Sequence, residues 1–117
     1  MNATLISTGR RTGQPRPAKL YVWPDGDERF VLVGSAAGQD QDPAWVHNLR
    51  AAPRCILRFG KVDRPGQVRE VGPGPERDRL WTMVVDAFRY YGTYQRKTSR
   101  LLPLFVFEPD RPATPTA

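Results

Sequence analysis

Cysteine, histidine and long apolar runs are nearly missing from this chain of 117 residues. The single cysteine, Cys55, excludes an internal disulfide framework, and the single histidine, His47, has no spaced partners with which to bind a metal. No stretch approaches the roughly 18 apolar residues that a membrane-spanning helix needs. The first residues also lack the charged and apolar regions of a secretory signal. We therefore expect a cytoplasmic protein without a metal site.

Groups for hydrolytic or thiol chemistry are scarce as well. Asp25, Asp27, Asp40 and Asp42 all fall in turn or cap positions, so no carboxylate pair suited to hydrolysis is predicted. Strand alternation places Cys55 on the same side as two apolar neighbours, and no base is tied to it by sequence. We expect Cys55 to be a packing residue.

Positive charge is plentiful. The chain has eighteen Lys and Arg and twelve Asp and Glu residues, which gives a net charge of +6. Such a charge attracts nucleic acid, an anionic membrane surface or a polyanionic cofactor. Two basic clusters, at residues 10–19 and 89–100, are far apart in sequence and can meet at one site. A nucleic-acid partner is not predicted, because no helix-turn-helix, zinc finger or aromatic RNA-binding signature accompanies the charge.

Apolar periodicity and turn residues predict a mainly β fold with helices (α+β) in one domain, residues 1–109, followed by a disordered tail, residues 110–117. Strands are expected at 4–8, 18–23, 30–33, 54–59, 67–71 and 101–107. The second and third should pair across the Pro24-Asp-Gly-Asp27 turn. One helix should span 44–52, capped by Asp42, and a second should begin at Gly74-Pro75 and carry a stripe to Tyr91. This order indicates a six-stranded antiparallel barrel with two covering helices.

Two segments offer binding chemistry. The loop Gly9–Arg16 combines glycines, a hydroxyl and three arginines, a set that can hold phosphate or carboxylate, although Arg-rich turns are often only solvated. The segment Phe88–Lys97 carries three tyrosines, whose phenols donate hydrogen bonds at neutral pH and whose rings can wall a planar ligand. The alternative is that these tyrosines pack a helix end against the barrel.

Several motifs, in order, resemble the deazaflavin (coenzyme F420)-dependent nitroreductase family. They are Thr8-Gly-Arg-Arg-Thr-Gly-Gln-Pro-Arg16, Leu20-Tyr21, Gly34-Ser35, Asp42-Pro-Ala-Trp45 with Asn48-Leu49, and Tyr94-Gln-Arg-Lys-Thr98 with Arg100 and Pro103. The resemblance runs from about Leu5 to Pro109. It implies a split β-barrel like that of flavin reductases, and hydride transfer from reduced coenzyme F420 to a quinone, a nitroaromatic or an activated C=C bond.

The resemblance also implies roles for individual residues. The coenzyme's phosphate and acidic tail would be held by Arg10, Arg11, Thr12, Gly13, Gln14, Pro15 and Arg16. The deazaflavin ring would be bordered by Leu20, Tyr21, Ser35, Ala36, Ala37, Pro43, Ala44, Trp45 and Asn48. The acceptor pocket would be lined by Tyr21, Phe88, Tyr91 and Tyr94. The candidates for proton donation are Ser35, Tyr91 and Tyr94. One departure is Ala36, where many relatives have a lysine.

The same resemblance implies a homodimer that acts on a small-molecule acceptor, and lipophilic quinones would bring it to the membrane surface. Two other interpretations of the scaffold stay open. A fatty-acid or lipid carrier without enzymatic activity would use the arginines to hold a carboxylate. A flavin mononucleotide (FMN) oxidase of related fold is the third interpretation, less favoured because the loop resembles the deazaflavin branch.

Overall fold

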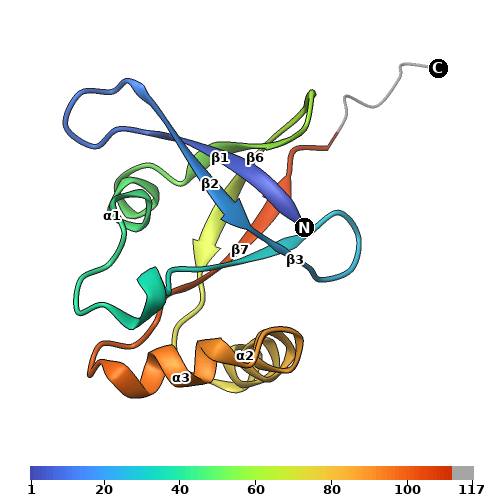
Figure 1. Ribbon diagram of the computed structural model, residues 1–117. Coiled ribbons are helices and arrows are strands. Elements are labelled where there is room, and N and C mark those ends of the chain that lie inside the picture. The colour runs from blue at the N-terminus through green and yellow to red at the C-terminus, as the bar shows by residue number, and fades with distance from the viewer. Residues whose placement is uncertain (112–117) are drawn as a thin grey trace.

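The computed structural model describes residues 1–111 and shows a curled antiparallel sheet with helices packed against it (Figure 1). The strands are β1 (Asn2–Thr8), β2 (Pro15–Tyr21), β3 (Trp23–Pro24), β4 (Phe30–Val33), β5 (Arg54–Phe59), β6 (Val62–Glu70) and β7 (Leu104–Pro109). The helices are the short 3-10 helix η1 (Ala36–Gly38), α1 (Ala44–Ala51), α2 (Pro75–Ala87) and α3 (Tyr90–Lys97). Within residues 1–111, no helix has the length and apolar character to cross a membrane.

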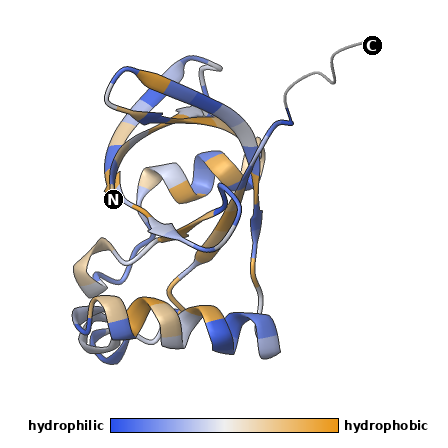
Figure 2. Ribbon diagram, turned by 90° about the vertical axis from the view of Figure 1, so that its right-hand side faces the viewer, coloured by the Kyte–Doolittle hydropathy of each residue, from blue (hydrophilic) through white to orange (hydrophobic). Residues whose placement is uncertain are grey.

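The two edge strands of the sheet follow each other directly in the chain. The strand order is β2-β1-β5-β6-β7-β4-β3, so β2 and β3 lie at opposite edges although only Val22 separates them. Val22 is fully buried, and it exchanges two hydrogen bonds of 2.8 Å with the N-H and carbonyl groups of Met1. The crossing at Val22 brings the edges together, and Figure 2 shows the strands as a ring with α1 in its middle in projection.

Strands β4 and β7 are buried on both faces, and each face belongs to a different hydrophobic core. The core inside the barrel contains Ala3, Leu5, Val22, Leu32, Trp45, Val46, Leu49, Cys55, Leu57, Val68, Phe105 and Phe107. The core outside it, under α2 and α3, contains Val31, Val33, Val71, Leu80, Val84, Tyr91, Leu104 and Val106. Successive side chains of a strand point to opposite faces, so in β4 and β7 they enter the two cores alternately. The stretches Phe30–Val33 and Leu104–Phe107 are therefore apolar throughout.

The predicted fold class is confirmed, but the strand and helix counts are corrected. Residues 1–111 form seven strands and three α-helices, where the sequence predicts six and two. The predicted segment 18–23 divides at Val22. Residues up to Tyr21 pair with β1 rather than with β4, and only Trp23 and Pro24 pair with β4. The alternation that predicts this strand does not reveal that its pairing partner changes at Val22.

The predicted second helix is interrupted at Phe88, which has an extended backbone (φ −145°, ψ 91°) between α2 and α3. Its ring lies 4.9 Å from the ring of Tyr91 and 6.3 Å from that of Tyr94. The apolar stripe therefore continues across the break between the two helices. For this reason, the helical period of the stripe alone cannot show where the break lies. Residues 112–117 of the predicted tail lie outside the described residues. Asp110, at the start of the predicted tail, forms an ion pair with Arg54.

The tight contact between β6 and β7 can be tested by a substitution at Gly66. A Cβ added there would collide with the Glu108 carbonyl and come within 2.7 Å of the Phe107 ring. Gly66→Ala should lower the free energy of unfolding by about 1–3 kcal/mol, the range typical of overpacked positions. Gly72→Ala is the matched control, because a Cβ at Gly72 meets nothing within 4 Å. Urea denaturation followed by tryptophan fluorescence measures both, and equal stabilities would contradict this packing.

Candidate functional site

The loop between β1 and β2 is ordered by its own hydrogen bonds. The N-H of Gly9 donates to the Gln14 carbonyl (2.8 Å), and the N-H of Gly13 donates to the Gly9 carbonyl (2.8 Å). Gly13 has a φ of 72°, a backbone angle that residues other than glycine rarely adopt. The hydroxyl of Thr12 accepts from the Gln14 N-H (3.2 Å) and from Arg16 Nη2 (3.0 Å). The loop therefore holds the Arg16 guanidinium in a fixed place.

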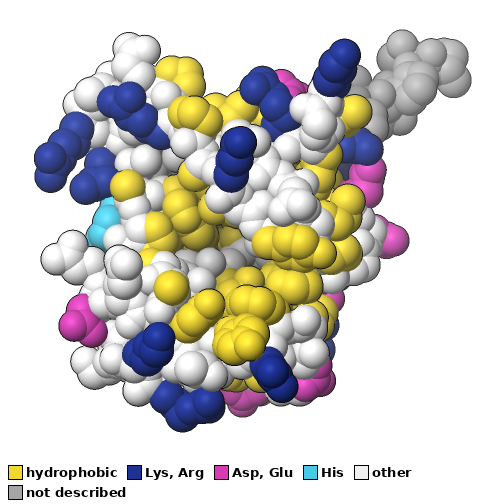
Figure 3. Space-filling model, viewed as in Figure 1, with side chains coloured by type: hydrophobic (Ala, Val, Ile, Leu, Met, Phe, Trp, Pro, Cys, Tyr) yellow, Lys and Arg dark blue, Asp and Glu magenta, His cyan; other side chains and the backbone are white. Residues whose placement is uncertain are grey.

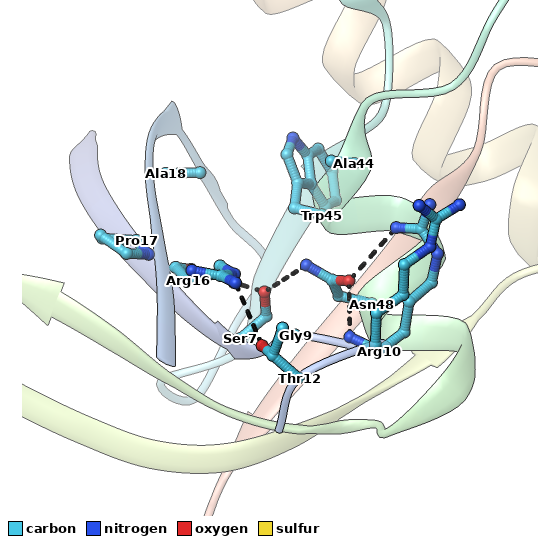
Figure 4. Close-up of a pocket in the computed structure, with 11 residues that line it drawn as sticks. Ser7, Gly9, Arg10, Thr12, Arg16, Pro17, Ala18, Ala44, Trp45 and Asn48 are labelled. Atoms are coloured by element: carbon cyan, nitrogen blue, oxygen red, sulfur yellow. Dashed lines mark hydrogen bonds between the residues drawn. The ribbon is translucent and has the colours of Figure 1, made fainter. Parts of the chain in front are cut away.

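The buried amide of Asn48, on α1, ties this loop to the barrel (Figure 4). Its oxygen accepts from the backbone N-H of Arg10 (3.1 Å) and from Arg10 Nη1 (3.4 Å). Its nitrogen donates to the hydroxyl of Ser7 (3.4 Å), which is also buried. Asn48 thus connects the end of β1, the arginine loop and α1, and most of its hydrogen-bonding capacity is used within the protein.

A pocket of about 430 Å³ lies between the loop and α1. Its lining contains seven of the predicted coenzyme residues: Arg10, Arg11, Thr12, Arg16, Ala44, Trp45 and Asn48. It also contains four that the prediction left out: Ser7, Gly9, Pro17 and Ala18. Ser7 could have been found, since alternation along β1 places it on the inward side with Ala3 and Leu5, where a polar residue is unusual.

The arginines of this pocket differ from most others in their partners. Seven arginines elsewhere form ion pairs with carboxylates: Arg50, Arg54, Arg58, Arg64, Arg69, Arg79 and Arg100. Arg10, Arg11 and Arg16 form none with any carboxylate of residues 1–111. Figure 3 shows Lys and Arg side chains gathered over the β1–β2 hairpin, beside an apolar band across the middle of this face. The pocket is therefore suited to an anion.

Other predicted coenzyme residues lie outside this pocket. Gly13 and Pro15 line a different hollow, together with Ile6, Cys55 and neighbouring residues, and Gln14 is exposed. Leu20 packs against the barrel core, and Tyr21 is 48% exposed with its ring 4.5 Å from that of Trp23. Pro43 is half-buried at the start of α1.

The segment Gly34–Gln39, with the predicted Ser35, Ala36 and Ala37, has a strained backbone. Ala36 and Ala37 have φ angles of 44° and 53°, in the left-handed region that disfavours residues with a Cβ. Its two glycines permit close packing. A Cβ on Gly34 would lie 2.8 Å from the Val46 side chain, and one on Gly38 would lie 2.7 Å from the Tyr94 carbonyl. The segment is thus fitted between α1 and α3.

Phe88, Tyr91 and Tyr94 form an aromatic cluster with Trp23, which the sequence prediction omitted. The indole N-H of Trp23 donates to the Tyr91 hydroxyl (2.9 Å), which leaves the phenol's own hydrogen free to donate. Burial raises the pKa of Tyr91 above its usual value, and the Trp23 hydrogen bond opposes this only in part. Tyr91 is therefore a neutral donor at physiological pH.

Cys55 is confirmed as a packing residue. It is buried in the barrel core, and burial raises the pKa of its thiol to about 12, so the nucleophilic thiolate is scarce at neutral pH. The group of His, Cys, Asp and Glu side chains that a metal would need is not found within residues 1–111.

The chain matches the F420H(2)-dependent quinone reductase family over residues 2–109. It belongs to that family. The F420H(2)-dependent quinone reductase of Mycobacterium tuberculosis strain H37Rv is 36% identical over 108 residues, which cover 87% of this chain and 69% of the relative. The family is one of oxidoreductases whose cofactor is reduced coenzyme F420. The resemblance drawn from the motifs is thereby confirmed.

Solved structures support the same assignment. A structure of an F420-H2 dependent reductase superposes with a TM-score of 0.81 at 30% identity, covering 92% of this chain and 93% of the other. A structure described as a domain-swapped dimer gives a TM-score of 0.82 at 30% identity and covers 92% of this chain and 79% of the other. The split-barrel fold of F420-dependent reductases is therefore shared.

The pocket's composition fits the family's cofactor. Its three guanidinium groups without carboxylate partners suit phosphate and carboxylate groups, and Pro17, Ala18, Ala44 and Trp45 give it an apolar wall. The Trp45 ring is backed by Phe105 at 6.0 Å, which holds the wall in place. Charged and apolar linings side by side suit a ligand with an anionic tail and a flat ring system, and the volume lies in the usual range for small-molecule sites.

Asn48→Leu should separate the loop from α1. The substitution leaves the Ser7 hydroxyl and the Arg10 N-H without their buried partner, so we expect a loss of about 1–3 kcal/mol in unfolding free energy. Gln14→Ala, at an exposed position of the same loop, should change it by less than about 0.5 kcal/mol. Urea denaturation compares the two variants, and an equally stable Asn48→Leu protein would show that the amide does not hold the loop.

Proposed function

We propose that this protein binds coenzyme F420 with its anionic tail in the pocket between the β1–β2 loop and α1, and reduces a quinone. The observation that carries the proposal is that three arginines line one pocket, and none of them has a carboxylate partner among residues 1–111. When bound, the reduced coenzyme would supply the hydride. Arg10, Arg11 and Arg16 would bind the phosphate and acidic tail.

The remaining predicted residues have roles that the family resemblance suggests. Ala44 and Trp45, which line the pocket, would border the ring from α1. The segment with Ser35, Ala36 and Ala37 is not part of that lining, and its place beside the ring is what the family resemblance implies. Tyr91 would donate the proton that neutralises the reduced acceptor, because its hydroxyl oxygen is already held by Trp23. Ser35 and Tyr94 stay candidates for the same role.

The breadth of acceptors and the assembly are also proposals. A quinone is favoured by the family, and nitroaromatics and activated C=C bonds are further acceptors of the same chemical kind. The similarity to a structure described as a domain-swapped dimer supports a homodimer. Cytoplasmic localisation and peripheral contact with membranes stay predictions from the sequence.

A fatty-acid carrier is the second candidate function. It is supported by the apolar band in Figure 3, which adjoins the basic hairpin and would suit an acyl chain whose carboxylate meets the arginines. Parallel titrations with oxidised coenzyme F420, FMN and a long-chain fatty acid decide between the two. Saturable binding of the deazaflavin alone supports the reductase, and binding of the fatty acid alone would replace it with the carrier.

Arg11→Gln should weaken coenzyme binding at least about tenfold, since one charge-assisted hydrogen bond contributes roughly 1.5–3 kcal/mol. Arg58→Gln is the matched control, because Arg58 is paired with Asp63 and does not line the pocket. Fluorescence titration with oxidised coenzyme F420 measures both dissociation constants. Equal affinities in the two variants would mean that Arg11 does not contact the anionic tail.

Tyr91→Phe should lower quinone turnover by about a hundredfold or more, the lower range for loss of a general acid, with the coenzyme dissociation constant unchanged. Because the pKa of Tyr91 is raised above its ordinary value, the phenol stays protonated at neutral pH and the loss should be the same from about pH 6 to pH 9. Tyr90→Phe is the control, since Tyr90 is 47% exposed. Unchanged turnover in Tyr91→Phe would limit Tyr91 to packing.

A further inference from the structure

Arg100 lies between α3 and β7, outside both hydrophobic cores, and its guanidinium makes four hydrogen bonds to neighbouring protein groups. Nε donates to the Gln39 carbonyl (2.6 Å), and Nη2 donates to the Ser35 carbonyl (2.7 Å). Nη1 donates to the Gly34 carbonyl (3.0 Å) and to the Asp42 carboxylate (2.7 Å). A planar fork with several fixed donors is needed to hold four acceptors in this way, and a lysine cannot replace it.

Three of these acceptors belong to the strained segment Gly34–Gln39. Within the segment, the N-H groups of Gly38 and Gln39 donate back to Ser35 and Ala36, at 2.8 and 3.1 Å, and Gly34 donates to the Pro103 carbonyl (2.8 Å). The left-handed conformations of Ala36 and Ala37 are unfavourable and persist only where the surroundings enforce them. The Arg100 guanidinium binds carbonyls on both sides of the two alanines, so it is placed to contribute to this enforcement.

The fourth acceptor connects Arg100 to the pocket. Asp42, which the sequence predicts as the cap of α1, makes no capping hydrogen bond; the cap position is taken by Pro43. Its carboxylate instead joins Arg100 to Arg50 on α1 (3.0 Å), and Arg50 in turn pairs with Glu70 on β6. The Arg100 and Asp42 side chains are 14% and 16% exposed, so their pair is largely shielded from solvent. The network fixes the start of α1, the helix that carries Trp45 and Asn48.

We propose that Arg100 is a positioning residue for the coenzyme site: it locks the Gly34–Gln39 segment to α1 and so sets the place of the ring-bordering residues. This inference rests on the proposed function. Arg100 need not touch the coenzyme to act on the site, because each of its three guanidinium nitrogens already donates to a protein acceptor. A single guanidinium thereby joins the end of α3, the strained segment and the pocket helix.

The test compares Arg100→Lys with Arg79→Lys. Arg79 forms a bidentate pair with Asp25, at 3.0 Å for each bond, and has no contact with the segment, so its replacement controls for the loss of a guanidinium–carboxylate pair. Amide hydrogen exchange of a peptide covering residues 34–42 reports the segment itself. Fluorescence titration with oxidised coenzyme F420 reports the site, and near-UV circular dichroism reports the fold. Asp42→Asn is the second variant if Arg100→Lys does not fold.

We expect faster exchange of the Gly38 and Gln39 amides in Arg100→Lys and an increase of at least about tenfold in the coenzyme dissociation constant, as when a residue that orients ligand-binding groups is lost. The control should change neither. Unchanged exchange, or faster exchange with unchanged affinity, would overturn the inference. If the unmodified protein does not bind coenzyme F420, the proposed function fails by itself, and the exchange rates still show whether Arg100 locks the segment.

Discussion

The crossing at Val22 is the constraint on which the rest of the structure depends. A sheet whose edge strands β2 and β3 are consecutive in the chain has to curl until its edges meet, and the fully buried Val22 lies at that meeting point. The curl gives the sheet an inside, where α1 packs, and an outside, where α2 and α3 cover β4 and β7. It also leaves the β1–β2 hairpin projecting beside α1, as Figure 1 shows, and the pocket forms between them.

Arginines perform distinct tasks around this frame. Those on the outer surface are mostly neutralised by carboxylates, and such exposed pairs add little stability. Arg77 is buried and donates to the carbonyls of Val71 and Leu102, which pins α2 to the sheet. Arg100 organises the Gly34–Gln39 segment. The hairpin arginines have no carboxylate partner among residues 1–111 and line one pocket together, and this convergence, rather than the net charge, marks a candidate anion site.

The sequence predicts the fold class, most strands and the residues of the arginine loop, because these depend on local alternation, turn chemistry and motif order. It does not predict the strand switch at Val22 or the helix break at Phe88, since both depend on which surfaces meet in the folded chain. The same limit applies to the site. Ser7 can be inferred from the alternation of β1, but Trp23 reaches Tyr91 only in the folded chain, where its indole N-H donates to the Tyr91 hydroxyl. The Asp42 carboxylate is taken by Arg100, 58 residues away, rather than by the helix that it precedes. The predicted Gly13, Gln14 and Pro15 belong to the loop's motif but lie outside the pocket.

A structure of the protein bound to oxidised coenzyme F420 would show whether the pocket between the β1–β2 loop and α1 is the coenzyme site. We expect phosphate or carboxylate oxygens of the coenzyme within hydrogen-bonding distance of Arg10, Arg11 or Arg16, and the deazaflavin ring against Trp45 and the Gly34–Gln39 segment. A coenzyme bound elsewhere, with the three arginines still facing solvent, would contradict this expectation.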